Sequence, residues 1–113
     1  MSANPSPAPQ RTLTIDLHLS PDGTPTLVCS GRITLEEAIQ FRSHVKSLAP
    51  KHKVVLADLS RVDSVDSSGL GSVLGTYISA KSEGCDLRLI NVHSRVKDLL
   101  NITHLNAVFE GSY

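Results

Sequence analysis

The stretch from residue 54 to residue 78 constrains the fold more than any other part of the sequence. It opens with Val54-Val55-Leu56-Ala57, an apolar run that is too short for a core helix and begins with β-branched residues. Such a run is typical of a strand buried on both faces, as in parallel sheets. Apolar residues then recur at helical spacing, at Leu70, Val73, Leu74, Tyr77 and Ile78. A buried strand that leads into an amphipathic helix predicts an α/β fold.

Length and charge exclude several classes of protein. The 113 residues suffice for one hydrophobic core and not for two. Acidic and basic residues balance at 11 each and Trp is absent, so we expect no nucleic-acid partner. No apolar run approaches the roughly 20 residues that a membrane span requires, so we expect no membrane insertion.

The ends of the chain and its thiols indicate where the protein works. Residues 1–10 are rich in Pro, Ser and Ala, which predicts a disordered tail before a single folded domain at residues 11–113. That tail has neither the basic nor the apolar region of a signal peptide. Cys29 and Cys85 are isolated, which favours reduced core thiols over a disulfide. We therefore expect a cytoplasmic protein.

The first part of the domain has the pattern of a β-hairpin followed by a helix. A strand with one face on the core is predicted by the alternating residues Leu13, Ile15, Leu17 and Leu19. A turn at residues 21–24 then leads to a second strand at residues 26–30, which Gly31-Arg32-Ile33 leaves. Thr34 and Glu37 form a capping box, and Pro50 ends the helix. Its expected buried stripe is Leu35, Ala38, Phe41, Val45 and Leu48.

The remaining elements alternate between strand and helix. We expect a strand at residues 53–59, a loop at 60–65, a helix at 68–83 closed by Gly84, and a strand at 87–92. Ser94 is a candidate N-cap for a short helix at residues 95–102, and Val108-Phe109 for a last short strand. This order predicts a single mixed, mostly parallel sheet of about four or five strands, with an N-terminal hairpin, packed against about three or four helices.

The junction Asp66-Ser67-Ser68 lies where a strand gives way to a helix. A helix start presents unpaired N–H groups and the positive end of the helix dipole. It can therefore hold a hydroxyl at the surface and tolerate a phosphate there. Asp66 or Ser67 also suits a simple N-cap, and an Asp66 cap is compatible with a phosphate on Ser67.

Three glycines near the start of this helix, Gly69, Gly71 and Gly75, are unusual because each costs roughly 0.5–1 kcal/mol relative to Ala in a helix interior. Two explanations stay open: tight packing of the helix on the sheet, or a smooth surface against which a partner lies. In the second case, Ser68, Ser72 and Thr76 form a polar ridge on the side away from the core and belong to the docking face.

Enzymatic and metal chemistry have little support in the sequence. A hydrolase with Ser67 or Ser68 as nucleophile requires a His base and a Gly-x-Ser-x-Gly elbow, whose first Gly is missing. No pair of His or Cys residues has metal-ligand spacing. The histidines are scattered, at His18, His44, His52, His93 and His104. We therefore predict no catalytic residue, no metal and no cofactor.

Several stretches together resemble the STAS domains of bacterial anti-sigma factor antagonists. The central match is Asp58-Leu59-Ser60 followed by Val65-Asp66-Ser67-Ser68-Gly69-Leu70-Gly71. Supporting matches, in the same order as in the family, are Gly31-Arg32-Ile33, the strand at residues 87–91, and Val96-x-x-Leu99-Leu100 leading to Val108-Phe109-Glu110. The resemblance covers about residues 11–110.

The resemblance implies a regulatory protein that binds an anti-sigma factor with serine kinase activity and thereby frees a sigma factor. It implies that the kinase phosphorylates Ser67 and that a serine phosphatase reverses this. The docking surface it implies consists of Asp63, Ser64, Asp66, Ser68, Gly69, Gly71, Ser72, Gly75 and Thr76. Family members often carry bulkier apolar residues around the equivalent of Ser64, which leaves the identity of the partner open.

Two further questions also stay open at this point. The same fold serves as an adaptor subunit of stressosome-like scaffolds or of membrane transport complexes, which is the alternative function. The oligomeric state is a monomer or a weak dimer.

Overall fold

The computed structural model describes residues 12–109, which form one layer of strands and one set of helices. The elements are β1 (Leu13–Leu19), β2 (Pro25–Ile33), α1 (Leu35–Leu48), β3 (Val54–Val65), α2 (Ser67–Ser82), β4 (Asp86–Ile90) and α3 (Ser94–Ile102). Two short 3-10 helices, Ala49–Lys51 and Leu105–Ala107, follow α1 and α3. The tail predicted at residues 1–10 lies outside the described residues.

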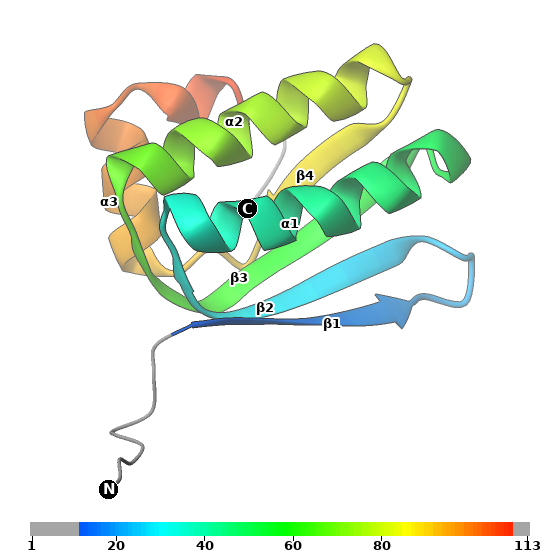
Figure 1. The fold of residues 1–113 in the computed structure, drawn as a ribbon, viewed down its shortest axis with the longest axis horizontal. Coiled ribbons are helices and arrows are strands. Elements are labelled where there is room, and N and C mark those ends of the chain that lie inside the picture. Colours follow the sequence, from blue (N-terminus) through cyan, green and yellow to red (C-terminus); the bar gives the residue numbers. More distant parts are fainter. Residues whose placement is uncertain (1–11, 110–113) are drawn as a thin grey trace, which may run out of the picture.

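The sheet confirms the predicted α/β class with its N-terminal hairpin. The strand order is β1-β2-β3-β4, with β1 antiparallel to β2 and the other neighbouring pairs parallel. Helices α1 and α2 run side by side over one face of the sheet (Figure 1). The core lies between them and the sheet, where Phe41, Val73 and Leu87 are buried.

Local sequence signals begin α1 and end α2 as expected. The capping box is present, since the Thr34 N–H donates to Glu37 Oε1 at 3.0 Å. The Thr34 hydroxyl also donates to this carboxylate, and that bond holds the pKa of Glu37 below its ordinary value. Helix α2 ends at Ser82, and Gly84, just after the C-cap residue Glu83, has a φ of +81°, the left-handed conformation that glycine adopts readily.

Strands β2 and β3 are both longer than predicted. Gly31-Arg32-Ile33 belongs to β2, and residues 60–65, expected as a loop, belong to β3. The two extensions pair with each other, and Val62 is fully buried there. Register shifts interrupt the pairing of β2 with β3 between Val28 and Ser30 and between Gly31 and Arg32. Ser60, Arg61 and Ser64 are exposed, which is why the composition of this segment resembles that of a loop. In β3, Val55 and Ala57 are buried whereas Val54 and Leu56 are half-buried, so burial on both faces was wrong as stated.

Several predicted core residues lie instead on the surface. Leu35 and Ile78, at the margins of their helical stripes, are 57% and 58% exposed. In β1, Leu13 is buried, but Leu17 and Leu19 are 52% and 64% exposed, because the helices do not extend over that end of the edge strand. The alternation of apolar and polar residues in β1 correctly predicted which face of the sheet Leu17 and Leu19 occupy. It did not predict that their side chains are exposed on that face.

Two predictions near the C-terminus were also wrong. The N-cap of α3 is His93, whose Nδ1 accepts the Arg95 N–H at 3.1 Å, and Ser94 is the first helical residue. Val108 and Phe109 form no strand; they follow the second 3-10 helix in a turn. Phe109 is nevertheless buried, with its ring 5.1 Å from that of Tyr77 in an edge-to-face contact.

Candidate functional surface at the start of α2

The candidate surface begins at the N-cap of α2, which is Asp66. Its carboxylate accepts the Gly69 N–H at 2.6 Å, so one of the unpaired donors of the first turn is satisfied. The Asp66 N–H is directed back to the Ile33 carbonyl at 3.4 Å. Asp66 therefore fixes the direction in which α2 leaves the sheet, and its negative charge lies beside the next residue.

Ser67 is the first residue of α2 and is exposed, as is Ser68. Because Asp66 takes the capping role, the Ser67 side chain is not needed for it. Within residues 12–109, the Ser67 hydroxyl has no hydrogen-bond partner. A hydroxyl that is exposed, unbonded and held at the positive end of a helix dipole is accessible to a modifying enzyme.

Gly69 faces inward and is buried. A Cβ atom at this position would lie 2.0 Å from the Ile33 carbonyl oxygen and 3.1 Å from the Thr34 Cα. The start of α2 therefore packs directly against the backbone between β2 and α1. Tight packing explains this glycine, and Gly69 does not belong to the open face where the resemblance had placed it.

Gly71 and Gly75 face outward. Both are exposed, and a Cβ atom at either would meet nothing within 4 Å. Packing therefore does not explain them. With Ser67 and Ile78 they form a line along α2, because Ile78 is 11 residues, about three full turns, from Ser67. We call these four residues the α2 outer line.

The exposure of one residue of the α2 outer line, Ile78, was not predicted from the sequence. Ile78 belongs to the apolar residues that recur at helical spacing, yet its side chain is 58% exposed. The signal that could have identified it is its three-turn spacing from Ser67, which places both on one side of the helix. The exposed Ile78 side chain and the two exposed glycines leave this side of α2 open to contact.

The prediction that Thr76 belongs to an exposed polar ridge was wrong. It is 1% exposed, and its hydroxyl donates to the Ser72 carbonyl at 2.8 Å, which allows a polar side chain to be buried. Ser72 is half-buried beside it, and only Ser68 of the predicted ridge is fully exposed. Thr76 therefore has a structural role.

Asp63 and Ser64 lie among the last residues of β3 before the cap rather than in a loop. Ser64 is exposed and is paired in register with Arg32 of β2, while Asp63 is half-buried. The Arg32 Nε atom lies 3.6 Å from Oε1 of Glu37, which is in the first turn of α1. The end of β3 thus brings polar groups from β2, β3 and α1 close to the α2 cap.

Asp58 supports this region from the middle of β3. Its carboxylate accepts the Ser60 N–H at 2.9 Å and the Asn91 side-chain amide at 3.0 Å. Burial alone would raise the pKa of Asp58, and these hydrogen bonds reverse that and lower it. Asn91 has a φ of +52°, so Asp58 also holds the sharp bend after β4.

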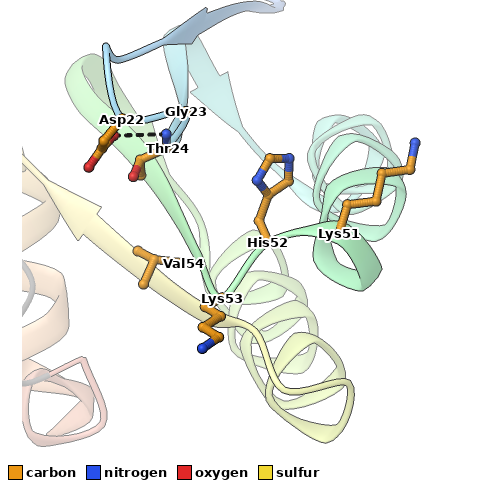
Figure 2. Close-up of a pocket in the computed structure, with 7 residues that line it drawn as sticks. All are labelled: Asp22, Gly23, Thr24, Lys51, His52, Lys53 and Val54. Atoms are coloured by element: carbon orange, nitrogen blue, oxygen red, sulfur yellow. Dashed lines mark hydrogen bonds between the residues drawn. The ribbon is translucent and has the colours of Figure 1, made fainter.

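A shallow pocket lies at the opposite end of β3, between the hairpin turn and the connection from α1 (Figure 2). Its volume is about 230 Å³. A hydrogen bond from the Ser20 hydroxyl, and another from the Thr24 N–H at 3.0 Å, lower the pKa of Asp22 to about 2. In Figure 2 the Lys51 side chain extends away from the turn. The polar groups of the pocket do not converge, so the surface of α2 is the stronger candidate site.

Residues 12–109 offer no metal centre and no membrane-spanning helix. No three His, Cys, Asp or Glu side chains in this part of the chain cluster as metal ligands would. No helix within it combines the length and apolar character needed to cross a bilayer. Cys29 and Cys85 are buried and unpaired, and burial raises the pKa of Cys29 to about 12.

Comparison with known proteins identifies the family to which this chain belongs. The STAS domain model matches residues 19–112, and the chain therefore belongs to the STAS domain family. The anti-sigma-B factor antagonist of Bacillus subtilis (strain 168) is 31% identical over 81 residues, which cover 72% of this chain and 74% of that protein. Homology to anti-sigma factor antagonists supports a regulatory role of the same general kind.

Solved structures share the fold. An anti-sigma factor antagonist from Mycobacterium paratuberculosis has a TM-score of 0.75 and 20% identity, covering 91% of this chain and 87% of its own. The Bacillus cell fate determinant SpoIIAA in its phosphorylated form has a TM-score of 0.64 and 18% identity, covering 83% and 86%. The four-stranded mixed sheet with three α-helices within residues 12–109 is thus a SpoIIAA-like STAS fold.

Proposed function

We propose that this protein is an anti-sigma factor antagonist that binds an anti-sigma factor with serine kinase activity and so frees a sigma factor in the cytoplasm. Phosphorylation of Ser67 switches it off, and a serine phosphatase restores it. The observation that carries this proposal is an exposed, unbonded Ser67 hydroxyl at the first position of α2, beside a capping carboxylate.

The geometry supports a switch that acts at the interface rather than on the fold. A phosphate on Ser67 would add a charge of about −1.5 to −2 at the positive end of the α2 dipole, which favours it by about 0.3–1 kcal/mol. The fold is therefore expected to tolerate the modification. A docked partner would instead meet a dianion next to Asp66, and desolvation and like-charge repulsion would oppose binding.

The outer line of α2 supports a partner surface next to the phosphoacceptor. Gly71 and Gly75 leave the helix backbone accessible, and Ile78 supplies apolar contact beyond them. Ser64, Ser68 and Asp63 are proposed to complete the surface on the other side of Ser67. A relative of the same fold has been solved in a phosphorylated form, which is consistent with a switch of this kind.

Phosphate mapping tests the proposal. The protein is incubated with ATP and the serine kinase anti-sigma factor encoded near it, and the modified residue is located by mass spectrometry. We expect a single phosphate on Ser67, none on Ser67→Ala, and an unchanged yield on Ser68→Ala, which is the matched control because Ser68 is the adjacent exposed serine. Phosphate on Ser68, or an unmodified protein that still binds the kinase and does not release the sigma factor, would overturn it.

A further inference from the structure

The edge strand β1 carries an uncovered apolar surface far along the chain from Ser67. Leu17 and Leu19 are paired in register with Leu27 and Pro25, which are buried. Paired residues share a face of the sheet, so Leu17 and Leu19 are on the helix-covered side. They are nevertheless 52% and 64% exposed. Figure 1 shows β1 at the border of the sheet, with α2 on the far side of α1.

The free edge of β1 also presents backbone groups. The Arg32 N–H donates to the Thr12 carbonyl at 3.2 Å, and the Ser20 N–H donates to the Thr24 carbonyl at 3.0 Å. Even-numbered residues therefore direct their backbone groups toward β2, and the odd-numbered residues direct theirs toward the open edge. The Leu13 carbonyl accepts the Gln40 side-chain amide at 3.3 Å. The N–H and C=O groups of Ile15, Leu17 and Leu19 have no partner within residues 12–109.

We propose that β1 is a docking surface for β1 of a second copy of this chain, paired antiparallel about a two-fold axis at Leu17. Ile15 then lies opposite Leu19 of the other copy, and Leu17 lies opposite its own equivalent. These are hydrogen-bonded pairs, because all three residues direct their backbone groups outward. The apolar side chains left exposed in the monomer meet across the axis, and the two sheets become one.

The side chains on the other face of β1 favour this register over its neighbours, because an imidazole N–H of His18 can donate a hydrogen bond to the carboxylate of Asp16. On the other face of β1, Asp16 and His18 are both exposed. Pairing about Leu17 places Asp16 opposite His18 of the other copy twice, at the closer, non-hydrogen-bonded positions. Moving the axis to Asp16 or to His18 would place like residues against each other. Pro21, which has no N–H, ends the pairing beyond Leu19.

The proposed dimer leaves the α2 surface free, so it is independent of the proposed function. One strand edge makes a small interface, and the dimer is accordingly weak and reversible. Each dimer presents two Ser67 surfaces.

Disulfide trapping tests the register. In Leu17→Cys the two Cα atoms at the axis would be about 5.5 Å apart, within the range that a disulfide spans. In Leu19→Cys, the matched control on the same strand and face, they would be about 13 Å apart or more. Under mild oxidation we expect about tenfold more cross-linked dimer for Leu17→Cys. Equal yields, or a monomer that does not self-associate at any concentration, would overturn the proposal.

Charge complementation gives a second, independent readout. In the Leu17→Cys background, Asp16→Lys alone and His18→Glu alone each place unfavourable pairs at the interface, and each should cross-link less. Mixed together, the two variants restore both pairs, since the lysine introduced in one copy would meet the glutamate introduced in the other. We expect the mixed dimer to exceed either homodimer about tenfold. A statistical mixture of the three dimers would overturn the assigned register.

Discussion

The glycines on the two sides of α2 serve opposite purposes. Gly69 is buried where a Cβ atom would lie 2.0 Å from a backbone oxygen, and Gly75 is exposed where a Cβ atom would meet nothing within 4 Å. In a sequence they are the same residue at the same cost in helix propensity. The comparison shows that the inner side of α2 requires glycine for the fold, whereas the outer side has it at a cost to stability that the fold does not explain.

The largest effect is expected from Gly69→Ala. Its methyl group cannot be accommodated by a flexible side chain, because the atoms it meets are the backbone of Ile33 and Thr34. Overpacking of this kind should destabilise the protein by about 3 kcal/mol. Chemical denaturation measures the difference from wild type. Wild-type stability in this variant would show that the two sides of α2 are equivalent, and the comparison would fail.

An intermediate effect is expected from Asp66→Ala, which removes the hydrogen bond to the Gly69 N–H. Loss of an N-cap should cost about 1 kcal/mol. Asp66→Asn retains a capping oxygen and should stay within a few tenths of a kcal/mol of wild type. Urea denaturation of the two variants and of wild type measures these differences in the free energy of unfolding. If both variants lose equal stability, the Asp66 charge rather than its capping bond holds the start of α2.

A smaller effect of opposite sign is expected from Gly75→Ala. With no atom to clash with, the substitution should stabilise the helix by about 0.5–1 kcal/mol. The same methyl group should weaken binding of the anti-sigma factor, because it lies on the outer line. Thermal denaturation and a binding titration separate the two. A variant that gains stability and binds normally would remove Gly75 from the docking surface.

The smallest effect on stability is expected from Ile78→Ser. The side chain is 58% exposed, so the free energy of unfolding should change by no more than about 0.5 kcal/mol. Val73→Ser, on the inner side of the same helix, is the contrast, since Val73 is 3% exposed and should lose several-fold more. Chemical denaturation of both variants measures the free energy of unfolding that each loses. Similar losses would contradict the assignment of Ile78 to the outer line.

Local signals made most of the fold predictable from the sequence. The capping box at Thr34, the positive φ at Gly84 and the alternation of strands and helices each depend on residues close in the chain. Tertiary contacts decided the rest. Residues 60–65 are polar, and only their pairing with the end of β2 makes them a strand. Leu17 is exposed because the helices leave the end of β1 uncovered, which alternation alone does not reveal.

In the candidate site, too, features that depend on local sequence were predictable, and features that depend on tertiary contacts were not. Asp66 as cap and Ser67 as a surface hydroxyl were both within reach of sequence reasoning, because helix starts have strong local preferences. Thr76 was not, since burial of its hydroxyl depends on the bond to the Ser72 carbonyl. The division between Gly69 and Gly75 also required the structure, because it depends on where the backbone of Ile33 lies.

The most direct test of the central claim is the affinity of the purified anti-sigma factor for the Ser67→Asp variant, measured by titration calorimetry. A carboxylate at the first position of α2 should leave thermal stability unchanged or slightly raised. Binding should weaken about a hundredfold, equivalent to about 2.7 kcal/mol. Ser43→Asp, at an exposed position on α1, is the control and should bind like wild type. Undiminished binding by Ser67→Asp would contradict the claim that Ser67 lies on the switched surface.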